Sequence, residues 1–268
     1  AGADVIATSS YQASFQGFKA CGFSQEQAVD LVRLSSSLAL QARDSFWRDS
    51  VRRKGRCKPL VALSIGPYGA SLHDGSEYHG NYGVSRQELV DFHRPRMALL
   101  AETGADLFAF ETIPSLEEAE VLLEMLQEFP GNPAWLSFSC KDGERVSHGE
   151  RFAECAETVA KSPQIAAVGV NCTSPDYIAE LLDTVKDLGV PRALYPNSGE
   201  EWQADGNRWV GKHCEHWAVT DWFDQGASVM GGCCRTPPAD ISRIRAQLIA
   251  HVTKRTTGRG NTSRTIVE

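Results

Sequence analysis

Cysteine is the residue type in this sequence best suited to bind a metal ion. The adjacent residues Cys233 and Cys234 follow the apolar run Ala227–Met230 and two glycines, and Cys172 comes just after the run Ile165–Val170. Three thiolates suit a tetrahedral Zn²⁺ ion and leave its fourth position for a substrate atom. Neighbouring cysteines seldom form a disulfide, because the ring closed between them is strained. A zinc site is therefore one interpretation, and three small buried hydrophobic side chains are the other.

Two glycines, Gly231 and Gly232, stand directly before the cysteine pair. Successive side chains of a regular strand point to opposite faces, so a regular strand does not turn two neighbouring sulfurs toward one ion. Glycine adopts backbone conformations that other residues avoid, and we expect these two to permit the unusual backbone that turns both sulfurs inward. Histidine offers no alternative ligand set, since the sequence contains neither H-E-x-x-H nor H-x-H.

The cysteines can meet only if a regular fold brings their strands together. Apolar runs of strand length recur along the chain, each followed by a turn and a helical pattern. These runs are Ala3–Thr8, Leu60–Ile65, Ala105–Phe110, Ala134–Ser139, Ile165–Val170, Arg192–Tyr195 and Ala227–Met230. The alternation predicts a (β/α)₈ TIM-type barrel, with an open doubly wound sheet as the structural alternative. No G-x-G-x-x-G motif follows any run, which removes one common reason to prefer the open sheet.

The two ends of the chain give further expectations. Gly104 and Gly226 each stand just past a predicted helix and directly before a predicted strand, where glycine ends a helix readily. Gly2 has the same position before the first strand, but no helix precedes it. We therefore expect residues 1–250 to form a barrel domain that lacks its first β-α unit. Residues 251–268 are rich in threonine, arginine and glycine without apolar periodicity, and they are expected to form a flexible C-terminal tail.

Helix starts are marked by capping residues. Ser24–Gln27, Ser85–Glu88 and Ser115–Glu118 each fit a capping box, in which two side chains satisfy free backbone amides reciprocally. Thr236 stands before Pro237 and is expected to cap the last helix.

The composition argues against several classes of partner. A net charge of −7 and a pI near 5.6 do not suit nucleic acid or an anionic membrane surface. No apolar run approaches the roughly 18 residues that a membrane span needs. The eight scattered cysteines lie in a chain too large to depend on disulfides, which predicts a reducing, cytoplasmic compartment.

Polar residues follow the predicted strands, where a barrel of this type has its active site. They include one carboxylate together with hydroxyl and amide side chains, namely Ser9, Tyr68, Glu111, Asn171 and Asn197. The connections 66–84 and 198–211 are longer than usual, as active-site lids and ligand walls often are. Their aromatic residues could face a cation and their acidic residues could neutralise one: Tyr68, Tyr78, Tyr82 and Trp202, with Glu77, Glu200 and Glu201. Packing of the loops is the alternative for each of them.

Several stretches of the sequence together match one known family. They are TSSYQAS (8–14), SIGPYGASLHDGSEYHGNY (64–82), FHRPRMALL (92–100), FETIPS (110–115), GVNC (169–172), YPNSGE (195–200) and GGCCRTPPADI (231–241). On these stretches the chain resembles the zinc-dependent homocysteine S-methyltransferases, and within them the branch that uses S-methylmethionine. The resemblance runs from the first residue to about Leu248.

The resemblance implies a (β/α)₈ barrel in which Cys172, Cys233 and Cys234 bind zinc. It implies transfer of a methyl group from S-methylmethionine to the thiol of homocysteine, which the zinc activates. Glu111 would bind the amino group of homocysteine, and the further expected substrate contacts are Ser9, Asn171, Asn197 and Tyr68. The sulfonium leaves as a neutral thioether, so the reaction needs alignment and exclusion of water but no general acid.

The chain departs from the family at one place. Family members begin with a strand that carries an Asp-Gly-Gly or Asp-Gly-Ala motif, and this segment is absent here. One alternative keeps the acceptor and changes the donor to S-adenosylmethionine or a betaine. Another is a truncated, catalytically silent barrel that binds zinc or a partner chain. A zinc hydrolase is disfavoured, because the histidine-rich ligand set usual for that chemistry is missing.

Overall fold

The protein is built around one curled parallel sheet. The structure, a computed structural model, describes residues 1–203, 206, 208–214 and 217–258. Seven strands pair in parallel in the order β1-β2-β3-β4-β5-β6-β9. They are β1 (Val5–Ala7), β2 (Leu60–Ile65), β3 (Leu107–Ile113), β4 (Ala134–Phe138), β5 (Ile165–Asn171), β6 (Arg192–Tyr195) and β9 (Ala227–Met230). Each of these strands falls on one of the predicted apolar runs, so the predicted α/β barrel-type architecture is confirmed.

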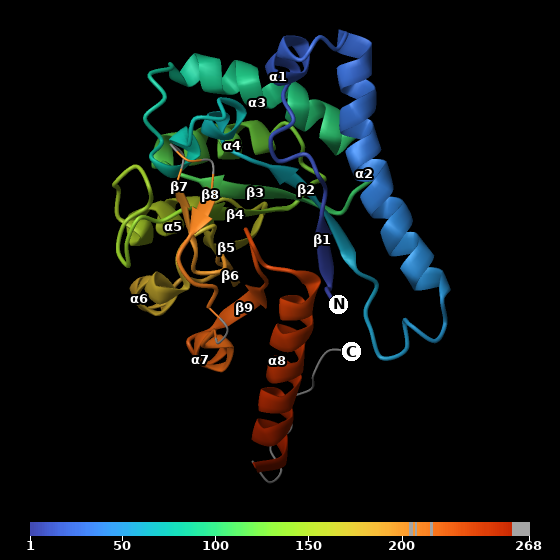
Figure 1. Ribbon diagram of the computed structural model, residues 1–268, viewed down its shortest axis with the longest axis vertical. Helices are drawn as coiled ribbons and strands as arrows, with labels where there is room; N and C mark the ends of the chain where they lie inside the picture. The colour runs from blue at the N-terminus through green and yellow to red at the C-terminus, as the bar shows by residue number, and fades with distance from the viewer. Residues whose placement is uncertain (204–205, 207, 215–216, 259–268) are drawn as a thin grey trace.

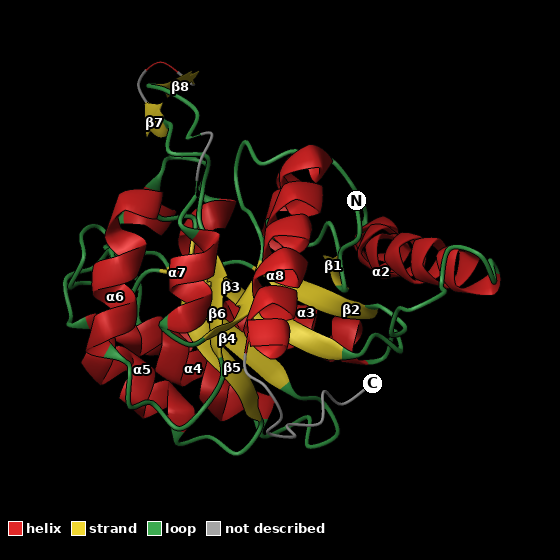
Figure 2. Ribbon diagram, turned by 90° about the horizontal axis from the view of Figure 1, so that it is seen from below, coloured by secondary structure: helices red, strands yellow, loops and turns green. Residues whose placement is uncertain are grey.

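Helices follow the strands and cover the outside of the sheet (Figures 1 and 2). They are α1 (Phe15–Ala20), α2 (Gln25–Arg48), α3 (Arg86–Ala101), α4 (Leu116–Leu126), α5 (Phe152–Ala160), α6 (Ile178–Thr184), α7 (Val219–Asp224) and α8 (Pro238–Gly258). Short 3-10 turns lie in two connections, η1 (Tyr68–Ser71) and η2 (Ser76–Tyr78) before α3, and η3 (Pro175–Tyr177) before α6. Among the described residues, no helix is both long and apolar enough to span a bilayer.

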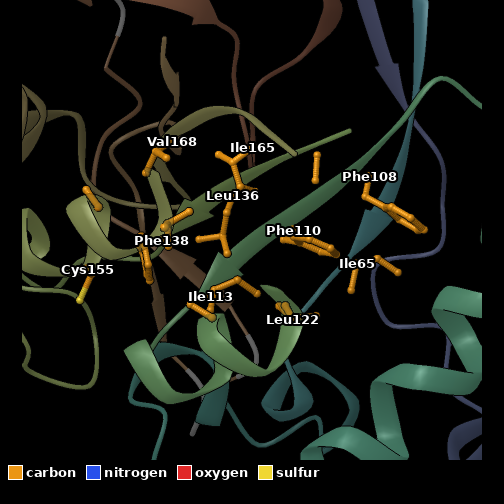
Figure 3. Packing of buried hydrophobic residues seen from close by; sticks show 14 of the residues in the cluster. Ile65, Phe108, Phe110, Ile113, Leu122, Leu136, Phe138, Cys155, Ile165 and Val168 are labelled. Carbon is orange, nitrogen blue, oxygen red and sulfur yellow. The ribbon is translucent and has the colours of Figure 1, made fainter. Parts of the chain in front are cut away.

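The two faces of the sheet carry side chains of different size. Large residues such as Phe110 and Leu136 pack against Leu122 of α4 in the main core (Figure 3). The second cluster contains only strand residues, most of them alanine, and lies on the face turned away from the helices: Ala62, Leu107, Ala109, Trp135, Ala167 and Ala193. The two clusters alternate within each strand because successive side chains point to opposite faces of the sheet. The small side chains fill the inner face of the curled sheet.

The capping predictions are confirmed at two of the three serines. Ser24 with Gln27 and Ser85 with Glu88 form complete capping boxes. Ser115 accepts a hydrogen bond from the backbone N–H of Glu118, but the Glu118 carboxylate is used elsewhere. Thr236 was expected to cap α8, and this is wrong, because its buried hydroxyl has no hydrogen-bond partner within the described residues.

Two segments expected to lack regular structure contain it. The connection 198–211 holds a small antiparallel hairpin of β7 (Glu201–Gln203) and β8 (Arg208–Val210), which lies beyond the end of the sheet in Figure 2. Helix α8 continues to Gly258, so residues 251–258 of the expected tail are helical, and residues 259–268 lie outside the described part. Helix α8 also binds the N-terminal segment, since the Arg245 guanidinium lies 2.7 Å from Asp4.

Candidate metal centre

Three cysteine sulfurs converge at the carboxyl ends of β5 and β9. The Sγ atoms of Cys172 and Cys234 lie 3.5 Å apart, and those of Cys233 and Cys234 lie 4.0 Å apart. All three lie within 4.8 Å of one another. The structure therefore brings together the three cysteines that the sequence singled out, including the two neighbours whose side chains a regular strand would separate.

The backbone around the sulfurs is held by the turn after β6. The N–H of Cys172 donates to the Tyr195 carbonyl at 3.2 Å, and the N–H of Cys233 donates to the Pro196 carbonyl at 2.8 Å. Cys172 has a φ of 50° and Arg235 a φ of 65°, in the left-handed region that side chains disfavour. Such strain persists only where surrounding contacts fix it, and it is common at functional sites.

The glycines before the cysteine pair act differently from the prediction. Gly231 and Gly232 are not among the residues with positive φ, so a left-handed backbone is not the reason for them. A Cβ atom on Gly232 would lie 2.1 Å from Cγ2 of Thr236. The glycine therefore permits the chain to fold back closely on itself, and the left-handed turn comes after the cysteines, at Arg235.

The electrostatics of the cluster suit a soft cation. Hydrogen bonds from the thiols of Cys172 and Cys233 lower the pKa of Cys234 to about 3. The three thiols thus favour a shared negative charge, and a bound cation would favour the thiolate form of each sulfur. A set of three sulfur donors around one point fits a thiophilic divalent metal such as Zn²⁺.

Asn171 orients one of the sulfurs. Its amide nitrogen lies 3.7 Å from Sγ of Cys233 and donates to Oγ1 of Thr112 at 2.8 Å. Its amide oxygen accepts hydrogen bonds from the Thr112 N–H at 2.6 Å and from Ser137 at 2.8 Å. The side chain is only 1% exposed, so these internal contacts fix it and give Cys233 an N–H donor beside its sulfur.

Glu111 supplies a carboxylate at the same end of the sheet. Its side chain accepts a hydrogen bond from the hydroxyl of Ser64. Burial raises the pKa of Glu111, and hydrogen bonds from Ser64 and Tyr195 oppose that rise. A half-buried carboxylate with two hydroxyl partners can accept further hydrogen bonds from a cationic amine.

The other expected substrate contacts lie in different surroundings. Ser9 is exposed after β1, whereas its neighbour Ser10 is buried and donates to the Ser64 carbonyl at 2.7 Å. Asn197 accepts a hydrogen bond from the Gly199 N–H at 3.0 Å. The ring of Tyr68 packs on Phe92, with the ring centroids 5.0 Å apart. Contacts of Ser9, Asn197 and Tyr68 with a substrate stay predictions.

Two tyrosines face the sulfurs instead of Tyr68. The hydroxyl of Tyr78, on η2, lies 3.6 Å from Sγ of Cys172. Tyr11, in the turn after β1, is hydrogen-bonded to Thr112, and burial raises its pKa, with the negative charge of Cys172 adding to the effect. The sequence predicts Tyr78 only as one of several loop aromatics, and it predicts Tyr11 only as one of the residues that line the mouth after the first strand. The available signal was its position three residues after Thr8, at the end of the first run.

A buried polar network holds the loops that carry these tyrosines. The Glu118 carboxylate accepts hydrogen bonds from the Tyr68 N–H at 2.6 Å and from the Tyr82 hydroxyl at 2.9 Å, and it pairs with Nε2 of His93 at 2.9 Å. Arg96, one turn along α3, donates to the carbonyls of Tyr11 and Gly66 at 3.1 and 3.2 Å. Side chains of α3 and α4 therefore hold the loops after β1 and β2 in place.

The curled parallel sheet and the three sulfurs at the carboxyl ends of its strands are typical of a barrel-type α/β enzyme with a cysteine cluster that could hold a metal ion. Residues 1–248 match the family model described as homocysteine S-methyltransferase. The chain belongs to this family of enzymes, which transfer a methyl group to homocysteine.

Individual relatives agree with the family model. Homocysteine S-methyltransferase YbgG of Bacillus subtilis is 48% identical over 250 residues, which cover 92% of this chain and 79% of that protein. Homocysteine S-methyltransferase 1 of Arabidopsis thaliana is 45% identical over 260 residues, with 92% and 79% covered. The crystal structure of the metallated form of the homocysteine methyltransferase MmuM from Escherichia coli superposes with a TM-score of 0.80 at 38% identity, covering 92% of this chain and 80% of that one.

Proposed function

We propose that this enzyme transfers the methyl group of S-methylmethionine to the thiol of homocysteine, with Zn²⁺ held by Cys172, Cys233 and Cys234. The single observation that carries the proposal is the convergence of the three sulfurs within 4.8 Å at the carboxyl ends of the strands. In barrels of this type the chemistry takes place at that end. Sulfur donors favour zinc among the abundant divalent ions, because oxygen-preferring ions such as Mg²⁺ bind thiolates poorly.

The chemistry requires activation of a weak nucleophile. A free thiol with a pKa of about 8.5 is mostly protonated at neutral pH and attacks slowly. When bound, zinc supplies the Lewis acidity that lowers the pKa of the homocysteine thiol. In the transfer, the homocysteine sulfur forms a bond to the methyl carbon and the sulfonium C–S bond breaks. The bonding pair stays on the donor sulfur, so two methionines form and the thiol proton passes to solvent.

Residues of this chain align the reactants. Glu111 would bind the homocysteine amino group, since it is a half-buried carboxylate near the sulfur cluster with hydroxyl partners that fix its position. The Asn171 amide lies against Cys233, and the Tyr78 hydroxyl lies against Cys172. Alignment of this kind accounts for a large part of the rate of bimolecular transfers.

S-methylmethionine is proposed as donor on the sequence of the loop after β2. The stretch GPYGA with DGSEY (66–78) favours it over S-adenosylmethionine or a betaine. Donor competition tests this: purified protein receives homocysteine with each donor alone and then with pairs of donors, and methionine is measured. Preference for S-adenosylmethionine or betaine would contradict the proposed donor and leave homocysteine methyl transfer intact.

The zinc proposal has a separate test. Metal content is measured in the wild type, in Cys234→Ser and in Cys57→Ser, the last being an exposed cysteine outside the cluster. We expect Cys234→Ser to lose zinc and activity together and Cys57→Ser to keep both. Full activity without bound zinc would overturn the mechanism, and bound zinc without methionine from any donor would favour the catalytically silent barrel. We further propose a cytoplasmic location, supported by eight free cysteines, which suit a reducing compartment.

A further inference from the structure

We propose that Glu77 is the carboxylate that binds the cationic centre of the methyl donor. This inference rests on the proposed transfer from a positively charged donor. Glu77 lies on η2 (Ser76–Tyr78) between Ser76 and Tyr78, and the Tyr78 hydroxyl lies 3.6 Å from Sγ of Cys172. The Glu77 carbonyl accepts a hydrogen bond from Ser139, directly after β4, at 3.4 Å. The turn is thus held at the carboxyl end of β4, and its Tyr78 side chain reaches the sulfur of Cys172.

The carboxylate of Glu77 is incompletely satisfied. Its Oε2 atom is hidden from solvent and has no hydrogen-bond partner within the described residues. Its charged neighbours are Asp74, His73 and Cys234. A buried carboxylate oxygen without a donor is unfavourable, so the site gains free energy when a positively charged group enters. Burial raises the pKa of Glu77, which reflects the same lost hydration.

Two other polar residues of the long loops, Glu200 and Tyr82, have partners elsewhere. Glu200 accepts a hydrogen bond from Ser198 and forms an ion pair with Arg235 at 3.2 Å. The hydroxyl of Tyr82 donates to Glu118. The side chains of Glu201 and Trp202 lie outside the described part of the structure. Asp74 accepts a hydrogen bond from the Ser76 N–H at 2.9 Å. Among the loop carboxylates whose side chains are described, Glu77 combines a position near the cluster with an unused buried acceptor.

The donor's chemistry matches such a group. The candidate donors carry the methyl group on a sulfonium or a quaternary ammonium, and this centre loses its positive charge when the methyl group leaves. A fixed negative charge beside that centre favours the charged donor over the neutral thioether product. Glu77 then contributes to donor binding and to product release, and it does not accelerate the bond-making step itself, because the positive charge decreases as the methyl group is transferred.

Steady-state kinetics of Glu77→Gln on zinc-loaded protein test this assignment. We expect KM for S-methylmethionine to rise about tenfold, while KM for homocysteine and kcat change little. Calorimetric binding gives a second readout: affinity for S-methylmethionine falls by the same factor, and affinity for methionine is unchanged. Glu77→Asp keeps the charge and is expected to retain most of the donor affinity. Glu117→Gln, an exposed carboxylate on α4, is the matched control for net charge and should behave as wild type.

The outcomes separate this inference from the proposed function. An unchanged KM and affinity for the donor in Glu77→Gln would overturn the inference and leave methyl transfer untouched. Equal losses for S-methylmethionine and methionine, or equal losses in the Asp and Gln variants, would also overturn it, because charge would not be the cause. A wild type that transfers no methyl group from any cationic donor would instead refute the proposed function.

Discussion

The amide nitrogen of Asn171 lies 3.7 Å from the sulfur of Cys233, a residue 62 positions later in the chain. Asn171 ends β5, and the next residue, Cys172, supplies another sulfur of the cluster. One strand end thus provides both a sulfur and the group that orients a second sulfur. Outer groups of this kind set ligand geometry and commonly change metal affinity by one to two orders of magnitude.

Replacement of this amide is expected to weaken metal binding. Asn171→Ala removes the N–H donor to Cys233 and leaves the Thr112 N–H without its acceptor. We expect zinc affinity to fall about 10- to 100-fold, measured by competition with a chromogenic chelator. Unchanged affinity would show that the contact does not influence the cluster.

A methyl group at Gly232 should displace the cysteine pair. Gly232→Ala would place its Cβ atom 2.1 Å from Thr236, so the turn that carries both sulfurs must shift. We expect a loss of about 1–3 kcal/mol in the free energy of unfolding, together with reduced zinc content. Gly189→Ala is the control, since a Cβ atom there meets nothing within 4 Å. Equal stability of the two variants in denaturant titrations would contradict the proposed steric role.

Glu88 and Glu118 occupy the same position relative to their helix starts and differ in burial. Glu118 is 0% exposed and joins three partners, whereas Glu88 is an exposed partner in a capping box. Glu118→Ala is expected to cost about 3 kcal/mol of unfolding free energy, because it leaves buried donors unsatisfied. It should also raise KM for both substrates by loosening the loops over the sulfurs. Glu88→Ala should have a small effect on stability and none on KM. Similar losses of unfolding free energy in Glu118→Ala and Glu88→Ala, measured by denaturant titration, would refute the buried role of Glu118.

The stability of the fold should depend on pH through His93. Burial lowers the pKa of this side chain, which is 0% exposed beside Glu118. Below the unfolded-state pKa of about 6.5, the unfolded chain takes up a proton that the folded chain does not. The contribution of neutral His93 to the free energy of unfolding is therefore fully present above that pH. It decreases as the pH falls below it, by at most about 1.4 kcal/mol per pH unit. Denaturation of His93→Gln at several pH values should give a shallower dependence than the wild type, and parallel curves would contradict this.

The strands and the sulfur cluster were the most predictable features. Buried parallel strands are almost uniformly apolar, so runs such as Leu60–Ile65 and Ala227–Met230 coincide with β2 and β9. The cluster followed from cysteines at strand ends and from the family resemblance. All seven strands are predictable because each is buried on both faces and is therefore apolar almost throughout. This pattern can be recognised from the local sequence alone.

Features that depend on distant contacts could not be predicted. The side chain of Glu118 fits a capping box locally, but partners on α3 and in the loop after β2 bind it more strongly. The role of Gly232 depends on where Thr236 lies, and that is set by the start of α8. Tyr78 could be separated from Tyr68 and Tyr82 only when the path of the long loop was known.

The adjacent carbonyls of Tyr195 and Pro196, which receive the N–H groups of Cys172 and Cys233, tie metal capture to the order of folding. Cys172 follows β5, whereas Cys233 and Cys234 follow β9, the last strand of the sheet in the chain. No partial set of sulfurs is positioned until β9 has docked in register beside β6. A metal ion bound as proposed would therefore find its three sulfurs in position only after β9 has docked, and it would hold this strand in place.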